Sequence, residues 1–240
     1  MEKGEALMDS TQLLIMISTY NGKSSISDVI NEVRYVLKRE NISCQFLLVD
    51  DGSRDGSQEV LLQIASHDSD VSVLCYDKNV GQQENIRRGL RGIQGEPLIV
   101  LTMDDDGQHP PEVIPVLVHK AMEGYDMVYG IPEWTKESRP PFIRRYGSRL
   151  RDIFFRKAFR LPKGVKVSAY RVMTGNLARR LSVSNRNFFY LSAEALQANI
   201  RVANIPYPYV PRKTGKSSYS IWKLACLYTK IWYYYRWKKN

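Results

Sequence analysis

The chain has 240 residues, 43% of them hydrophobic and 25% charged, which is ordinary for one globular domain or one domain with an elaborated end. Its three cysteines (Cys44, Cys75 and Cys226) are scattered without a C-x-x-C pair, which indicates a reducing compartment and argues against a disulfide framework or a zinc site. The sequence shows neither a secretory signal pattern nor an apolar run of about 18 residues, the usual length of a spanning helix.

Charge is divided unevenly along the chain. Residues 1–133 contain 11 Lys and Arg against 22 Asp and Glu, a net charge of −11, whereas residues 134–240 contain 24 against 3, a net charge of +21. The second part also holds all four tryptophans and ten of the 15 tyrosines. This asymmetry predicts that the basic part meets an anionic surface, either nucleic acid or membrane phosphate.

Apolar runs and helical patterns alternate through the first half. Strands are predicted at residues 13–18, 45–49, 71–76 and 125–129, and in the apolar run that begins at Pro97. Helices are predicted over residues 24–39, 58–66, 82–92 and 111–123. Such alternation is typical of an α/β fold, a mostly parallel sheet flanked by helices on both faces.

Polar motifs stand where four of these strands end, at residues 19–21, 50–51, 79–81 and 104–108. Ligands of such a sheet bind outside the carboxyl ends of its strands. In extended chain Asp104, Asp106 and Gln108 would point the same way and Asp105 the opposite way. Three oxygen donors on one side suit Mg²⁺ or Mn²⁺, whereas a short acidic motif taken alone is more often a solvated turn.

Two nucleotide-binding motifs are excluded. No G-x-G-x-x-G follows a strand, which argues against a dinucleotide fold of the dehydrogenase type. The run T-G-K-S at 214–217 imitates the end of a P-loop, but Val210 stands where that motif requires glycine.

The motifs in combination resemble family 2 glycosyltransferases of the GT-A fold. D-D-D-G-Q-H-P-P-E at 104–112 fits the pattern D-x-D-x-Q-x-P-P-E, and S-T-Y-N, V-D-D-G-S-R-D and N-V-G-Q-Q precede it in order, at 18–21, 49–55 and 79–83. Later motifs are S-A-Y-R at 168–171 and R-K-T-G-K-S-S-Y-S at 212–220. Within the family, the sequence is most similar to the polyprenyl-phosphate glycosyltransferases, which include dolichol-phosphate mannose synthase. The resemblance covers about residues 12–222.

The resemblance implies roles for the matching residues. Those implied to bind the nucleotide-sugar are Thr19, Tyr20, Asn21, Asp50, Asp51, Gly81, Asp104 and Asp105, with Asp50 in a supporting role. A divalent cation (Mg²⁺ or Mn²⁺) bridging the donor diphosphate would be held by Asp104, Asp106 and Gln108. The implied catalytic residues are Asp106, Arg171 and Arg212. Acceptor or phosphate contacts are implied for Arg144, Arg145, Ser148, Lys216, Ser217 and Ser218.

The sequence departs from the family pattern at three places. Gly22 stands where relatives usually carry Glu, and a lysine is at 216 where relatives have it at the position of Ser218. Residues 163–167 lack the acidic residue that many relatives place before the Y-R motif. A sugar hydroxyl acceptor needs a base, whereas a phosphate monoester is already largely dianionic at neutral pH. The missing acid therefore favours a phosphate acceptor, although Glu194, Asp105 or Asp106 could still serve as the base.

Two basic amphipathic stretches occur in the second half, over residues 142–159 and from Ile221 onward. In the tail the apolar stripe falls at 221, 224, 225, 228, 231, 232 and 235. Basic amphipathic helices with Trp and Tyr are typical of a membrane interface. The alternative to membrane contact is that these helices pack on the sheet. For residues 142–159 the two interpretations are equally weighted, and for the tail membrane contact is favoured.

The sequence therefore predicts a metal-dependent, inverting glycosyltransferase that moves a sugar from a UDP- or GDP-linked donor to a polyprenyl phosphate. Residues 1–210 would form the GT-A domain, and residues 211–240 the acceptor loop and a basic aromatic tail. The enzyme is expected to be peripheral on the cytoplasmic face of an anionic membrane and to bind no nucleic acid, with homo-oligomerisation left open. The alternatives are a carbohydrate hydroxyl acceptor and a non-catalytic module that binds nucleic acid or membrane.

Overall fold

The computed structural model describes residues 13–134, 142–211 and 221–237, and within these ranges the side chains of residues 142–148, 221 and 223 are not described. Its strands are β1 (Leu13–Thr19), β2 (Gln45–Asp50), β3 (Val71–Cys75), β4 (Ile99–Asp104), β5 (Met127–Glu133), β6 (Arg171–Thr174) and β7 (Val202–Pro208). Its helices are α1 (Ile26–Arg39), α2 (Ser57–His67), α3 (Gln82–Arg91), α4 (Ile114–Met122), α5 (Phe142–Phe159), α6 (Gly175–Ser182), α7 (Leu191–Ala195) and α8 (Ile221–Trp232), with the short helices η1 (Pro111–Val113) and η2 (Tyr233–Trp237).

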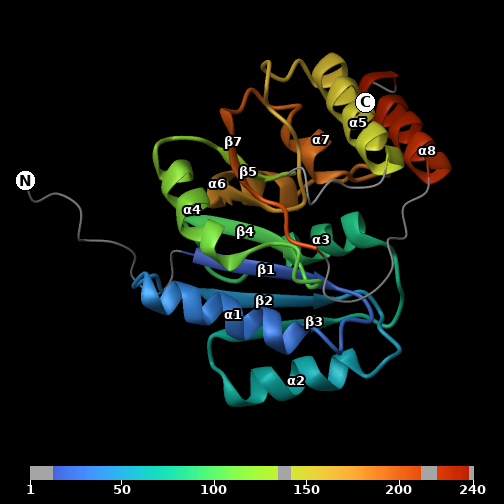
Figure 1. Cartoon of the computed structure of the whole chain (residues 1–240). Helices are drawn as coiled ribbons and strands as arrows, with labels where there is room; N and C mark the ends of the chain where they lie inside the picture. The colour runs from blue at the N-terminus through green and yellow to red at the C-terminus, as the bar shows by residue number, and fades with distance from the viewer. Residues whose placement is uncertain (1–12, 135–141, 212–220, 238–240) are drawn as a thin grey trace, which may run out of the picture.

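The strands form one mixed sheet, mostly parallel as predicted, in the order β3-β2-β1-β4-β6-β5-β7 (Figure 1). β6 is the exception, since it runs antiparallel to both β4 and β5. The sequence patterns did not predict β6 or β7. β6 has only four residues, and β7 is half-buried along most of its length, so neither shows the continuous apolar run by which the first strands were found.

Helices cover both faces of the sheet, and each face carries its own hydrophobic core. Alternate residues of β1 point to opposite faces, so Leu14 and Met16 enter one core and Ile15 and Ile17 the other. The first core is closed by α3, α5, α6, α7 and α8, and the second by α1, α2 and α4. The helix predicted over residues 24–39 is confirmed as α1, and its residues Ile30, Val33 and Leu37 are all buried in the second core.

Two predicted boundaries, and the premise of the alternation argument, need correction. The strand predicted at 125–129 is β5, which starts at Met127 and continues to Glu133 because it pairs with β7 over its full length. The helix predicted over 111–123 is divided into η1 and α4. β4 ends at Asp104, so Asp106 and Gln108 lie beyond the extended chain that the alternation argument assumed.

The C-terminal helix packs on the domain. α8 contacts α5, and the two lie side by side at the upper right of Figure 1. Ile231 and Tyr235 from the predicted apolar stripe are buried in the first core, and Tyr228 stacks on Phe154 of α5 at 5.1 Å. For these residues, packing on the protein is the correct alternative. Among the helices that the structure describes, none has the length and hydropathy needed to cross a bilayer.

We predict that Gly89→Ala destabilises the protein. Gly89 lies on α3 where the helix approaches β1 and β2, and a Cβ there would be 2.9 Å from Val49 Cγ2 and closer still to Met16 Sδ. Overpacking of this kind costs about 1–3 kcal/mol, which exceeds the gain of about 1 kcal/mol in helix propensity. Urea unfolding would measure the change, with alanine at the exposed Gln63 of α2 as control. Unchanged stability would show that α3 can move away from the sheet at no cost.

Candidate functional site

The polar motifs after β1, β2, β3 and β4 lie at one edge of the sheet, as predicted. β1 pairs in parallel with β2 and β4, and β2 pairs in parallel with β3, so all four strands end on the same side. Side chains also join the loops directly, since Asp51 bonds the loop after β3 and Asp105 bonds the end of β1. The convergence is therefore a property of the folded chain.

Asp50 holds the turn that follows β2. Its side chain is fully buried, and its Oδ2 accepts the N–H groups of Gly52 at 3.0 Å and Ser53 at 2.9 Å. The amide of Gln58 donates to the same oxygen at 2.7 Å and to the carbonyl of Tyr76 at 3.0 Å, which links this turn to the end of β3. Asp50 thus fixes the turn, and its supporting role at a nucleotide stays a prediction.

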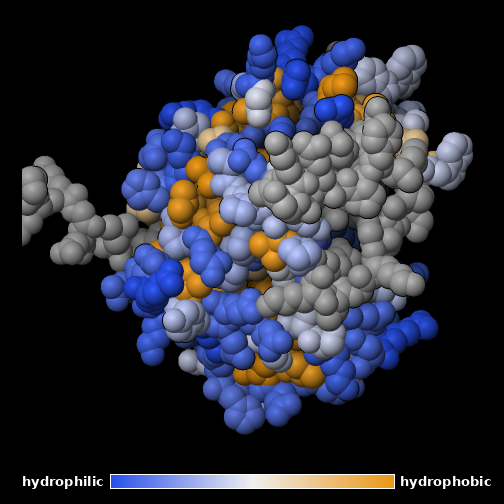
Figure 2. All heavy atoms as spheres, viewed as in Figure 1, coloured by the Kyte–Doolittle hydropathy of each residue, from blue (hydrophilic) through white to orange (hydrophobic). Residues whose placement is uncertain are grey.

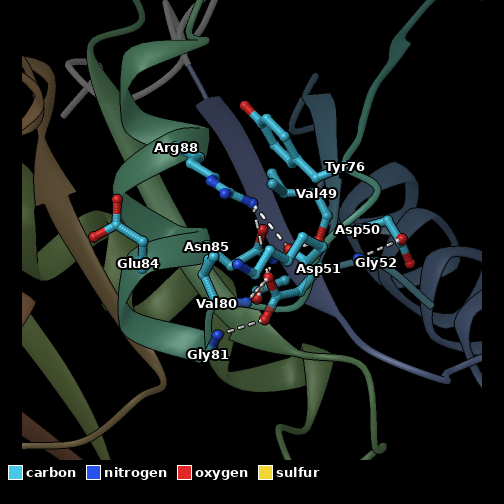
Figure 3. Close-up of polar contacts among 12 residues, drawn as sticks. Val49, Asp50, Asp51, Gly52, Tyr76, Val80, Gly81, Glu84, Asn85 and Arg88 are labelled. Atoms are coloured by element: carbon cyan, nitrogen blue, oxygen red, sulfur yellow. Dashed lines mark hydrogen bonds and ion pairs between the residues drawn. The ribbon is translucent and has the colours of Figure 1, made fainter.

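Asp51 connects the loop after β2 to the start of α3 (Figure 3). Its two oxygens accept the N–H groups of Val80 at 2.9 Å and Gly81 at 2.8 Å. Burial raises the pKa of Asp51. The two hydrogen bonds oppose this rise, and so does the positive charge of Arg88, whose Nη1 lies 3.9 Å from Asp51 Oδ1. The Arg88 guanidinium also lies over the ring of Tyr76, 4.2 Å from its centroid. A buried carboxylate thus fixes the position of Gly81, another predicted nucleotide-binding residue.

The loop after β1 is held against the same turn. The N–H of Asn21 donates to Ser53 Oγ at 2.8 Å, and Asn21 Oδ1 accepts the N–H of Arg54 at 2.9 Å. Asn21 has φ 55°, a left-handed conformation that asparagine tolerates better than most residues. Tyr20, next to it, is half exposed. The structure therefore brings Tyr20 and Asn21 beside the Asp50–Asp51 turn and leaves the Tyr20 ring open to a ligand.

Beyond Asp104 the chain turns sharply, with Gly107 at φ 71°. Asp106 Oδ1 accepts the N–H of Gln108 at 3.0 Å within this turn. The Gln108 amide nitrogen donates to Tyr209 Oη at 3.4 Å and to the carbonyl of Val210 at 3.5 Å. The orientations of Asp106 and Gln108 are therefore set by a turn and by contacts after β7, which corrects the prediction from strand alternation.

Asp104 is fixed by groups that the sequence did not predict. Its Oδ1 accepts a hydrogen bond from Gln82 of α3 at 2.5 Å, and its backbone N–H donates to His109 Nδ1 at 3.0 Å. The His109 ring is buried and stacks on Tyr170, with ring centroids 4.7 Å apart and planes inclined by 7°. Tyr170 in turn donates to the carbonyl of Pro110 at 2.8 Å. The only feature of the sequence that pointed to this contact with Asp104 is the histidine itself, which stands between Gln108 and the two prolines.

Asp105 points towards β1. Its carboxylate accepts a hydrogen bond from the hydroxyl of Thr19, a buried residue at the end of β1. Burial raises the pKa of Asp105 to about 6, and the charges of Asp104 and Asp106 act in the same direction, while the Thr19 hydrogen bond opposes them. The three consecutive aspartates thus bond to three different places.

Arg171, one of the predicted catalytic residues, lies at the start of β6 and is buried. Its Nε donates to Thr102 Oγ1 at 3.1 Å, and its Nη1 donates to the carbonyl of Ser168 and to Ser192 Oγ, both at 3.0 Å. Its Nη2 has no hydrogen-bond partner within the described part of the chain. Arg171 thus places an unpaired N–H group and a positive charge beneath the acidic turn.

Asp104 and Asp106 act on a common neighbour, Tyr207 of β7. Burial raises the pKa of the Tyr207 hydroxyl, and the charges of both aspartates raise it further. Within the described ranges, no group of three or more His, Cys, Asp or Glu side chains has a metal-binding arrangement. A cation at this turn would depend on two carboxylates and the Gln108 amide, as the sequence predicted, and that set stays a prediction.

Several predicted site residues lie outside what the structure describes. They are Arg212, Lys216, Ser217 and Ser218, together with the side chains of Arg144, Arg145 and Ser148. Glu194, considered as a base, is described: its Oε2 lies 2.9 Å from Arg186 Nε, and its Oε1 accepts a hydrogen bond from Ser184 at 3.0 Å. Glu194 is thus held in an ion pair on the face covered by α6 and α7.

Comparison with known proteins agrees with this architecture. Residues 14–180 match the family described as Glycosyl transferase family 2. The chain belongs to that family. Among curated relatives, the undecaprenyl-phosphate 4-deoxy-4-formamido-L-arabinose transferase of Yersinia pestis (strain Pestoides F) is 28% identical over 214 residues, which cover 89% of this chain and 64% of the relative. The family 2 chain thus spans less than two thirds of that relative's length.

Solved structures confirm the predicted GT-A fold. Glucosyl-3-phosphoglycerate synthase from Mycobacterium tuberculosis, in complex with Mn²⁺, UDP and phosphoglyceric acid, superposes with a TM-score of 0.61 at 14% identity, over 92% of this chain and 76% of that one. Mannosyl-3-phosphoglycerate synthase from Rubrobacter xylanophilus gives a TM-score of 0.60 at 16% identity, over 92% and 71%. At these identities the likeness concerns the fold alone.

The raised pKa of Asp105 predicts a pH-dependent stability. The folded state holds the proton more tightly than the unfolded chain, because burial raises the pKa from 3.8 to about 6. The resulting stabilisation is complete below pH 4 and is lost as the pH rises to about 6. Asp105→Asn should therefore gain stability relative to the unsubstituted protein between pH 4 and 7, by up to about 3 kcal/mol.

Urea unfolding at several pH values, with EDTA present to remove cations, would measure this difference. Asn at the exposed Asp77, which follows β3, serves as the control. A stability difference between Asp105→Asn and the unsubstituted protein that stays constant with pH would contradict the expected effect of burial.

Proposed function

We propose that this family 2 chain is an inverting glycosyltransferase that moves a sugar from a nucleotide-sugar, UDP- or GDP-linked, to a polyprenyl phosphate. The observation that carries the proposal is that the acidic turn after β4 is joined to the loops after β1 and β2. The Thr19 hydroxyl donates a hydrogen bond to Asp105 of the acidic turn. The Thr19 carbonyl accepts the N–H of Asp51, which follows β2, at 3.0 Å. A diphosphate held at the turn would have its nucleoside beside Tyr20 and Asn21. The Yersinia pestis relative, whose name is that of an undecaprenyl-phosphate transferase, supports the acceptor class.

The residues after β4 fit a divalent cation. Two carboxylates and an amide oxygen are the hard oxygen donors that Mg²⁺ and Mn²⁺ prefer. Because the Gln108 amide nitrogen donates to Tyr209 and Val210, the amide oxygen is the end left for a cation. Asp104, Asp106 and Gln108 would hold the ion, which when bound would neutralise charge on the leaving nucleoside diphosphate. The solved structure of glucosyl-3-phosphoglycerate synthase, which contains Mn²⁺ and UDP, supports this class of ion.

A phosphate acceptor removes the need for a strong base. A phosphate monoester is largely dianionic at neutral pH and can attack the sugar without losing a proton first. Glu194, one candidate for a base, is paired with Arg186. The chain's task would then be to orient donor and acceptor and to place positive charge near the phosphates. Arg171, with its unpaired Nη2, would contribute part of that charge from below the turn.

We further propose that the enzyme is peripheral on the cytoplasmic face of an anionic membrane. Ile231 and Tyr235 of the apolar stripe pack inward, but four aromatic side chains of α8 and η2 face outward: Trp222, Trp232, Tyr233 and Trp237. Exposed basic residues lie on these elements and on the neighbouring α5, namely Arg149, Arg156, Lys157, Lys230 and Arg236. Aromatic and basic side chains together suit the headgroup region of a bilayer. The coloured part of the face seen in Figure 2 is mostly hydrophilic, with separate apolar patches.

Transfer activity is the direct test of this function. Incubation with a panel of nucleotide-sugars, Mn²⁺ and a short-chain polyprenyl phosphate should give a glycolipid detectable by thin-layer chromatography. Asp106→Ala should lower turnover at least about 100-fold, since removing a charge-stabilising group has effects of this order. Alanine at the exposed Glu59 of α2 is the control and should leave turnover unchanged.

Two results would contradict the proposal. Retained turnover in Asp106→Ala would show that the acidic turn does not hold an essential cation. Glycosylation of an oligosaccharide, with only hydrolysis when polyprenyl phosphate is supplied, would show that the acceptor is a carbohydrate hydroxyl.

Membrane binding is tested with vesicles. The double variant Trp222→Ala/Trp237→Ala removes two side chains that are each 77% exposed. We expect its binding to phosphatidylglycerol vesicles to fall about tenfold or more, because tryptophan contributes strongly at the bilayer interface. Tyr35→Ala, which removes an aromatic ring 70% exposed on α1, is the matched control and should bind normally. Equal sedimentation of both variants with the vesicles would exclude α8 and η2 as the contact.

A further inference from the structure

Gly22 and Asp105 compete for one space. Gly22 is buried just after β1, and its φ angle is not in the left-handed region, so its backbone would accept other residues. A Cβ built there would nevertheless collide with Asp105 Oδ2 and with Thr19 Oγ1, at separations that real Cβ atoms do not show. A side chain at position 22 would therefore require the Asp105 carboxylate and the Thr19 hydroxyl to move.

The strand register explains why Asp105 is in this place. Ser18 of β1 pairs with Asp104 of β4, so the next residues, Thr19 and Asp105, emerge side by side at the ends of the two strands. The Thr19 hydroxyl donates to Asp105 and keeps its carboxylate against β1. Asp104 is bonded to Gln82 of α3 and Asp106 to its own turn, so neither of these carboxylates enters the volume next to Gly22.

The surroundings of this volume belong to the loops assigned to the nucleoside. Asn21 is fixed on Ser53 and Arg54, and the half-exposed Tyr20 stands beside it. Within the described residues, Thr19 is the one side chain that donates a hydrogen bond to Asp105, and the Asp105 side chain is only partly buried. A carboxylate with acceptor capacity left over suits the hydroxyl and N–H donors of a nucleoside.

We propose that Asp105 is a specificity-determining residue that accepts hydrogen bonds from the nucleoside of the donor, and that positions 22 and 105 together supply a single carboxylate to this pocket. The claim that Asp105 binds the nucleoside, called here the ligand half, depends on the proposed nucleotide-sugar function. The claim that positions 22 and 105 share one space, called the steric half, depends only on the fold. It follows that a carboxylate carried by residue 22 should replace Asp105 once Asp105 is removed.

The steric half is tested by a double-mutant cycle on stability, without any ligand. Gly22→Ala alone should lower the midpoint of thermal unfolding. In an Asp105→Ala background the same substitution should cost much less, because the carboxylate is gone and the released Thr19 hydroxyl can rotate. Additive effects of the two substitutions would show that the residues do not share a space.

The ligand half is tested by calorimetric titration with UDP and with GDP, each in the presence of Mn²⁺. For whichever nucleotide the unsubstituted protein binds more tightly, Asp105→Ala should weaken binding about tenfold or more, the usual effect of losing a charged hydrogen-bond acceptor. Gly22→Glu/Asp105→Ala should recover most of that affinity, whereas Gly22→Ala/Asp105→Ala should not.

The outcomes separate the two claims. If Gly22→Glu/Asp105→Ala binds no better than Asp105→Ala although the unsubstituted protein binds nucleotide, Asp105 serves packing alone and its assignment to the nucleoside is wrong. If the unsubstituted protein binds neither UDP nor GDP, the proposed function fails together with the ligand half. The stability cycle then still decides whether positions 22 and 105 share one space.

Discussion

Hydrogen bonds from loop N–H groups to buried aspartates hold the functional edge of this protein together. Asp50 accepts two N–H groups of its own turn, and Asp51 accepts two from the start of α3. A buried carboxylate is costly unless several donors surround it, so each loop and its aspartate stabilise one conformation of the other. The loops at the strand ends are therefore ordered before any ligand binds, which lowers the entropic cost of binding one.

The two faces of the sheet make different contributions. The face covered by α1, α2 and α4 is a core of mostly aliphatic side chains that aligns the first four strands. The other face carries polar side chains near the strand ends, among them Thr102, Arg171 and Ser192. These groups bond to one another beneath the acidic turn, while α5 and α8 extend the same face outward. The site thus has an apolar core on one face of the sheet and, on the other face, a hydrogen-bonded group of polar side chains that includes the positively charged Arg171.

Much of the fold could be predicted because the first four strands are local apolar runs separated by helical periods. The parallel order of such strands then brings their polar ends to one edge, as found. β6 and β7 were missed because their stability comes from partners far along the chain. β7 pairs with β5 over seven residue pairs, and that pairing also lengthens β5 beyond its predicted end. Likewise, the sequence showed an apolar stripe from Ile221 onward but not what the stripe contacts. Only the packing in the folded chain shows that Ile231 and Tyr235 face inward.

The sequence by itself determined that three consecutive carboxylates follow a buried strand and that a glycine follows Asn21. It could not determine where each carboxylate points, since the extended chain ends at Asp104 and the turn beyond it follows no simple period. Tertiary structure decided that Asp104 bonds to α3, Asp105 to Thr19, 86 residues away in the chain, and Asp106 to its own turn. The physical reason is that these orientations depend on strand register and on helix packing, which join distant segments and leave no local pattern.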